Sequence, residues 1–63
     1  MMFPQPPDPE EVRAARVAKN HSQTEAAAVI YKARGTWAQW ESGERKMDPA
    51  FFELYLIKSA KPA

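Results

Sequence analysis

The two tryptophans of this chain, Trp37 and Trp40, are three positions apart, so they lie on one face of any helix that contains both. The chain has 63 residues and no cysteine. A domain this small buries only about 60% of the surface that its unfolded chain exposes, so its core is marginal without large side chains or a covalent staple. Because no disulfide or thiolate metal site can form, stability must come from aromatic packing or from a second subunit.

The composition argues against several classes of protein. The chain has one histidine, His21, no glycine-rich phosphate loop and no paired carboxylates, so we expect no metal site, no cofactor and no enzyme activity. No apolar run approaches the roughly 18 residues of a membrane span, and the opening MMFPQPPDPEE lacks the basic and apolar regions of a signal peptide. We therefore expect a cytoplasmic protein with no membrane partner and no small-molecule substrate.

Charge is distributed unevenly, although the net charge of the chain is only +1. Residues 1–12 carry three acidic residues and no basic one. Residues 13–46 carry seven basic residues against three acidic ones, a net charge of +4. A basic central block behind an acidic start is compatible with binding a polyanion.

Helix-capping signals recur along the chain. Aspartate followed by proline favours the N-cap and the first position of a helix, Ser-x-x-Glu forms a capping box, and glycine readily adopts the positive φ that ends a helix. These signals predict four helices, which begin at Asp8-Pro9, at Ser22 with Glu25 as its box partner, at Ala33 or Arg34, and at Asp48-Pro49. The third helix would end at Ser42-Gly43 and the fourth would continue to Lys58.

The expected fold is all-α, because no strand-like alternation of apolar and polar residues is found. We expect a compact four-helix domain over residues 8–60, preceded by a disordered, proline-rich tail over residues 1–7. A ligand motif for a proline-binding partner is the alternative interpretation of the tail. Asn20 is expected to end the first helix in a left-handed conformation.

Two motifs lie in the predicted second and third helices. The first is Ser22-Gln23-x-Glu25-x-Ala27, and the second is Arg34-x-Thr36-x-x-x-Trp40-Glu41-Ser42-Gly43-Glu44-Arg45. Two short helices joined by a tight turn, the second basic at its start, have the geometry of a helix-turn-helix. The motifs resemble those of the XRE/Cro-like, or phage-repressor, helix-turn-helix family, and their spacing matches the family without a gap. The resemblance covers about residues 10–58 and implies a lambda-repressor-like DNA-binding fold.

The resemblance also implies roles for individual residues. The third helix would be the recognition helix, which reads base edges in the major groove of double-stranded DNA. Base contacts are expected from Arg34, Thr36, Ala38 and Gln39. Phosphate contacts, which set the register but not the sequence, are expected from Ser22, Gln23, Lys32, Arg45 and Lys46.

The resemblance implies an ion pair between Arg16 and Glu41, which would tie the first helix to the end of the third. Two separate solvated charges are the alternative. The family positions that match Trp37 and Trp40 are apolar and face inward, so both are expected in the core. A stacking platform for nucleic-acid bases is the alternative for this pair, and it requires aromatic side chains exposed on a groove.

Three residues depart from the family pattern. Tyr31 occupies the place of a common turn glycine, and because a tyrosine with positive φ would be strained, we expect this turn to be built differently. Lys32 and His21 each occupy a place where an aliphatic residue is common. We expect His21 to be a half-buried packing residue rather than a pH sensor.

The fourth helix is apolar almost all round, which suggests that it is buried on more than one side. The expected function is that of a homodimeric repressor that binds a palindromic operator, with Phe52, Tyr55 and Leu56 as candidates for the dimer interface. Packing of this helix within its own subunit alone is the alternative. A protein-interaction module, such as an antitoxin-like adaptor that uses the same helical fold, is the alternative function.

Overall fold

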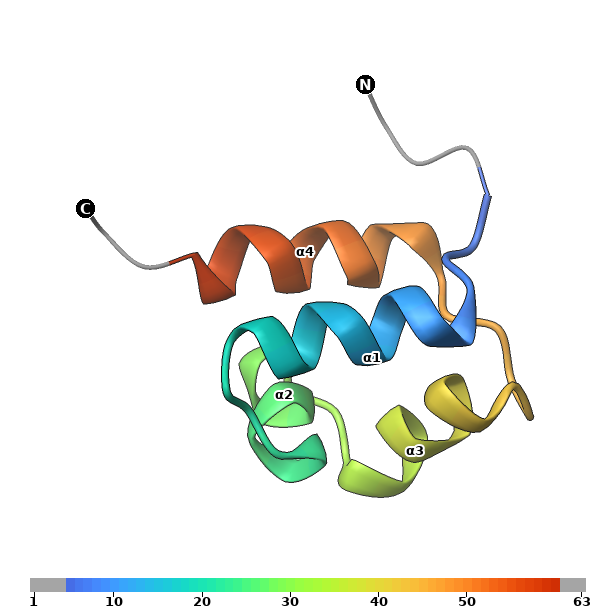
Figure 1. Cartoon of the computed structure of the whole chain (residues 1–63), viewed down its shortest axis with the longest axis horizontal. Helices are drawn as coiled ribbons and strands as arrows, with labels where there is room; N and C mark the ends of the chain where they lie inside the picture. Colours follow the sequence, from blue (N-terminus) through green and yellow to red (C-terminus); the bar gives the residue numbers. More distant parts are fainter. Residues whose placement is uncertain (1–4, 61–63) are drawn as a thin grey trace.

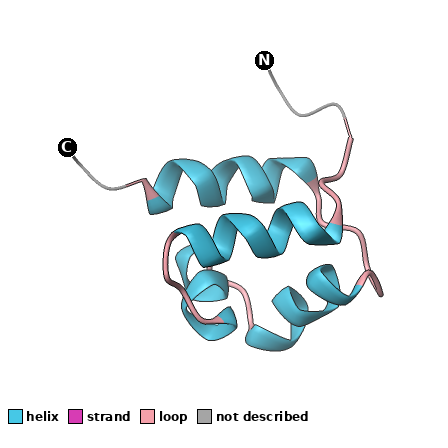
Figure 2. Ribbon diagram, viewed as in Figure 1, coloured by secondary structure: helices cyan, strands magenta, loops and turns pink. Residues whose placement is uncertain are grey.

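A computed structural model describes residues 5–60, which form four α-helices joined by short turns (Figures 1 and 2). The helices are α1 (Pro9–Ala18), α2 (Gln23–Val29), α3 (Arg34–Ser42) and α4 (Pro49–Ser59). No strand occurs in this part of the chain, so the all-α prediction is confirmed. None of these helices is long and apolar enough to cross a membrane. Residues 1–4 of the expected tail lie outside the described residues.

Local capping interactions explain why the helices begin where they do. Asp8 is the N-cap residue of α1, and its backbone N–H donates to the Glu11 carboxylate over 2.8 Å. Ser22 opens α2 with the predicted capping box: its hydroxyl accepts from the Glu25 N–H over 3.0 Å, and the Glu25 carboxylate accepts from the Ser22 N–H over 2.7 Å. The Asp48 side chain accepts from the N–H of Ala50 at the start of α4. The predicted starts of these helices are confirmed.

Residues with positive φ end the first three helices. Asn20 follows α1 with a φ of 59°, and Gly43 follows α3 with a φ of 84°, as predicted. Tyr31 follows α2 with a φ of 61°, so the expectation of a differently built turn is wrong. The N–H of Tyr31 donates to the Ala28 carbonyl, and the N–H of Lys32 donates to the Ala27 carbonyl. This Schellman pattern requires positive φ at Tyr31, and the two hydrogen bonds offset its strain.

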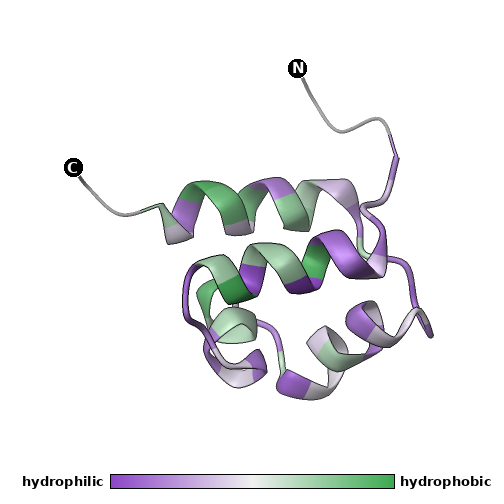
Figure 3. Ribbon diagram, in the orientation of Figure 1, coloured by the Kyte–Doolittle hydropathy of each residue, from purple (hydrophilic) through white to green (hydrophobic). Residues whose placement is uncertain are grey.

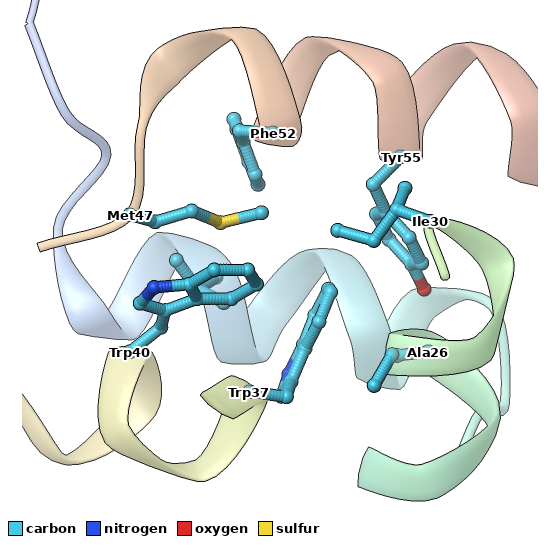
Figure 4. Packing of buried hydrophobic residues seen from close by; sticks show 9 residues of the cluster. Ala26, Ile30, Trp37, Trp40, Met47, Phe52 and Tyr55 are labelled. Carbon is cyan, nitrogen blue, oxygen red and sulfur yellow. The ribbon is translucent and has the colours of Figure 1, made fainter. Parts of the chain in front are cut away.

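The core is built around the two tryptophans (Figure 4). Trp37 is fully buried, and its ring packs edge-on against Trp40 and Tyr55, with centroid distances of 5.5 Å and 4.9 Å. Figure 4 shows both indoles extending from α3 toward side chains of α4 and the loop before it. The other buried apolar residues are Val12, Ala26, Ala27, Ile30, Met47 and Phe52. The predicted core role of the tryptophans is confirmed, and their burial excludes a stacking platform.

All four helices contribute to the packing around this core. Helix α3 packs against both α1 and α2, and α4 packs against α2. The side chains of Ala26 and Ala27 are small and fully buried, which lets the bulky indoles of α3 lie close to the backbone of α2. Aromatic packing therefore supplies the stability that a chain without cysteine needs.

The expected dimer interface on α4 must be corrected for two of its three residues. Phe52 is 5% exposed and Tyr55 is 0% exposed, because both belong to the core of their own chain. Leu56 is only half-buried. The more exposed apolar residues of α4 are Leu54 and Ile57, at 37% and 66%, and Figure 3 shows the apolar character of this helix. An apolar surface on α4 remains, but different residues form it.

Candidate nucleic-acid interface

Helix α3 has two faces of opposite character. Its inner face buries Trp37, Trp40 and Glu41. Its first residue, Arg34, is exposed, and the other residues with predicted base contacts, Thr36, Ala38 and Gln39, are half-buried. None of these four residues belongs to the buried core, so each keeps part of its surface open to solvent.

A surface hollow brings several of the predicted site residues together. It is lined by Lys32, Thr36, Gln39, Trp40, Arg45, Lys46 and Phe51. Five of these residues were expected to contact DNA, two at bases and three at phosphates. Thus, residues from the α2–α3 turn, from α3 itself and from the following loop converge on one surface, which we call the basic hollow. Arg34, Ala38, Ser22 and Gln23 do not line it.

The basic hollow is electropositive. Arg45 and Lys46 are exposed, and neither has an ion-pair partner among residues 5–60. The Nζ atom of Lys32 lies 4.6 Å from the centroid of the Phe51 ring, a cation–π contact that leaves its charge uncompensated. This contact explains how Lys32 is accommodated at a position where the resembling family commonly has an aliphatic residue: its methylene chain and ammonium group cover an aromatic side chain. Phe51 was not among the residues expected at the interface.

Glu41 is the buried acceptor that ties α3 to α1. Its carboxylate accepts from Arg16 Nε over 2.5 Å and from Arg16 Nη2 over 3.1 Å, so the predicted ion pair is confirmed. The indole N–H of Trp37 donates to the same carboxylate over 2.6 Å. Burial raises the pKa of Glu41, but the hydrogen bonds from Arg16, Trp37 and Gln23 outweigh it and hold that pKa at about 2. Glu41 is therefore ionised at neutral pH.

Gln23 has an internal partner that the sequence did not reveal. Its side-chain Nε2 donates to Glu41 Oε1 over 3.2 Å, so the amide that was expected to hold a phosphate also completes the Glu41 cluster. An amide nitrogen carries two N–H groups, and the second remains for another acceptor. Ser22 is similar: its hydroxyl oxygen accepts a backbone N–H, which leaves its hydrogen free to donate.

His21 lies between the α1–α2 turn and α4. It is half-buried, and its Nδ1 is 2.8 Å from the hydroxyl oxygen of Tyr55. The backbone carbonyl of His21 accepts from Arg16 Nη1 over 3.0 Å. The predicted packing role of His21 is thus confirmed, and the residue does not take part in the basic hollow.

No three His, Cys, Asp or Glu side chains of residues 5–60 gather where they could hold a metal ion. The sequence matches no protein-family model and no curated protein.

Proposed function

We propose that this protein is a sequence-specific DNA-binding regulator of transcription with an XRE/Cro-like helix-turn-helix, formed by α2, the turn at Tyr31 and α3. The observation that carries the proposal is the two-faced character of α3. Its inner face is anchored by two buried indoles and a buried carboxylate, and two of its outer residues, Thr36 and Gln39, line the basic hollow. A rigid helix with cations beside it is what base readout in a major groove requires.

Each outer residue of α3 has a chemistry suited to base edges. Arg34 donates to O6 and N7 of guanine, Gln39 pairs with adenine, and the methyl group of Thr36 contacts the methyl group of thymine. Ala38 is small enough to let the helix approach the bases closely. Since Gly35 has no side chain to contact a base, Arg34 and Gln39 provide most of the base-specific hydrogen bonds.

The cations of the basic hollow hold the phosphates on either side of the groove. Lys32, Arg45 and Lys46 lie beside α3 and make no ion pair among residues 5–60. Ser22 and the second amide N–H of Gln23 contribute at the start of α2. These contacts fix the register of the protein on the duplex, and the three cations supply most of the salt dependence.

The protein acts as a homodimeric repressor in this proposal. Two copies of α3 about 34 Å apart match one turn of the duplex and read a palindromic operator. Leu54 and Ile57, three positions apart on α4, form the contact between the copies in place of Phe52 and Tyr55. Repression follows from occupancy of the operator.

A protein-interaction adaptor is the second candidate function, and the observation that favours it is the same exposed pair of apolar residues on α4. An adaptor would use this surface for a different protein, and it would bind DNA weakly and without sequence preference.

Selection of duplexes from a random-sequence library distinguishes the two functions. The DNA-binding proposal predicts an enriched motif with two inverted half-sites whose centres are about 10 base pairs apart. The variant Arg34→Ala, carried through the same selection, should lose preference at one position of each half-site. A library that shows no enriched motif with the unaltered protein would contradict the proposed function and favour the adaptor.

A further inference from the structure

The segment that leads into α1 lies near the loop that follows α3. A second hollow is lined by Gln5–Pro9 and by Trp40, Gly43, Arg45 and Lys46. The two segments meet where the chain enters α1 and where it leaves α3 (Figure 1). Pro7 is buried, whereas its neighbour Pro6 is exposed. Pro7 belongs to the tail expected over residues 1–7, of which residues 5–7 are described.

We propose that residues Gln5–Pro9 form a brace, with Pro7 as its anchor, that positions Arg45 and Lys46 for their phosphate contacts. The proposal rests on the proposed function, because it assigns a positioning role within the same interface. Arg45 and Lys46 line both the basic hollow and the hollow beside the brace, so the loop that carries them lies between the two.

The brace supports a loop that is already held at both ends. At its start, the N–H of Arg45 donates to the Gln39 carbonyl over 3.2 Å. At its end, Met47 is 1% exposed and belongs to the core. Between these points, the exposed side chains of Arg45 and Lys46 have no ion-pair partner among residues 5–60. In this proposal, the brace limits where this part of the loop can move.

The chemistry of the brace suits this role. Three of its five residues are prolines, whose fixed φ leaves little conformational freedom to lose and whose missing N–H leaves no donor to satisfy. Pro9 lies near Gly43: its Cγ is 3.6 Å from the point that a Cβ atom at Gly43 would occupy, an ordinary contact distance. A loop that is held before DNA binds has less freedom to lose on binding, which favours affinity.

Two adjacent prolines provide a matched test. We would compare Pro7→Gly with Pro6→Gly in the full chain and measure the affinity for a selected operator duplex and for a scrambled duplex across a series of salt concentrations. We expect Pro7→Gly to weaken binding to both duplexes by about tenfold at low salt. The slope of log affinity against log salt concentration should also become shallower by about one to two, as it does when one or two phosphate contacts are lost. Pro6→Gly should behave as the unaltered protein. A Pro7→Gly protein with unaltered affinity and slope would overturn the proposal, and so would a loss confined to the operator duplex.

A second measurement needs no DNA. NMR order parameters should show the amides of Glu44, Arg45 and Lys46 near the value of about 0.85 that marks rigid backbone, and Pro7→Gly should lower them below about 0.6. Loop amides that are already below 0.6 in the unaltered protein would overturn the proposal. Circular dichroism establishes that Pro7→Gly keeps its helices, and Pro7→Ala replaces it if it does not. Failure of the unaltered protein to bind any duplex contradicts the proposed function and the brace together, whereas normal binding with an unaffected Pro7→Gly contradicts the brace alone.

Discussion

At the scale of single residues, Glu41 links the stability of the domain to the position of α3. It is buried and accepts hydrogen bonds from Arg16, Trp37 and Gln23, which come from α1, α3 and α2. Arg13 Nε lies 3.6 Å from the same carboxylate but is 66% exposed, so water screens most of its contribution. The carboxylate of Glu41 therefore links three helices, mainly through its buried partner Trp37 and its half-buried partners Arg16 and Gln23.

The substitution Glu41→Gln should lower the free energy of unfolding by about 3 kcal/mol, because it leaves the Arg16 cation without its counter-charge in a partly buried position. Urea denaturation followed by circular dichroism measures this change. Glu44→Gln is the matched control, since Glu44 is exposed three positions along the chain and should change stability by less than about 0.5 kcal/mol. Equal stability of the two variants would show that the Glu41 cluster does not support the fold.

The pKa of Glu41, lowered from 4.5 to about 2, predicts a pH dependence of stability. A carboxylate whose pKa is depressed in the folded state stabilises that state fully above its unfolded pKa, and the contribution is lost as the pH falls toward the folded pKa. The melting temperature should therefore fall between about pH 5 and pH 2 in the unaltered protein. Thermal melts of Glu41→Gln over the same range should fall less steeply. Parallel curves for the two proteins would contradict the assignment of this titration to Glu41.

At the scale of the elements, the sequence predicted the helix starts and ends, which depend on interactions between residues close together along the chain. The caps at Asp8, Ser22 and Asp48 and the left-handed stops at Asn20 and Gly43 were readable because each depends on a few adjacent residues. The ion pair and the inward-facing tryptophans of α3 were predicted from the resemblance. The four helices and their order followed from these signals.

Contacts between distant segments were not readable from the sequence. The positive φ of Tyr31 was missed because the closing hydrogen bonds of α2 favour it despite its side chain. The Lys32–Phe51 contact and the bond from Gln23 to Glu41 join segments 19 and 18 positions apart in the sequence, which no local pattern reveals. Pro7 is buried and lines the same hollow as residues more than 30 positions away.

The proposed role of α3 as a recognition helix predicts how two substitutions differ. Arg34→Ala should weaken binding to the operator by about 1–3 kcal/mol and relax the preference at one base pair of each half-site, because it removes a base contact. Competition binding with duplexes substituted at single positions measures this effect. Unchanged affinity and specificity would contradict the assignment of Arg34.

Lys46→Ala would remove a proposed phosphate contact instead, so it should weaken binding to all duplexes alike and reduce the slope of log affinity against log salt concentration by about one. Affinities for an operator and a scrambled duplex, measured over a series of salt concentrations, give both the loss of binding and the change in its salt dependence. A loss restricted to one sequence would mean that Lys46 reads a base.

At the scale of the whole molecule, the domain has a Cα radius of gyration of 10.7 Å and leaves two apolar residues of α4 exposed. Its core residues Phe52 and Tyr55 are already covered, so a partner subunit would add burial on α4 rather than complete the core. In the proposed homodimer, the fold of one chain would therefore be separable from the association of two.

This separation predicts that Ile57→Asp yields a folded monomer. A charge at a dimer interface opposes association because it would be buried without a partner, while Ile57 is 66% exposed in the single chain and contributes little to its core. Sedimentation equilibrium measures the change of mass, and circular dichroism measures the helices. Val17→Asp, at a position 56% exposed on α1, is the control and should remain dimeric. A monomeric unaltered protein would contradict the homodimer.

The most direct test of the central claim is fluorescence anisotropy with DNA from upstream of the protein's own gene and a scrambled duplex of the same composition, at two salt concentrations. Specific regulation predicts a dissociation constant of about 10⁻⁸ M or lower for the upstream duplex, about 10³-fold below that for the scrambled one at the same salt concentration. Both affinities should fall as the salt concentration rises, because Arg45, Lys46 and Lys32 release counterions from phosphates. Weak and equal binding to the two duplexes would contradict sequence-specific recognition by α3.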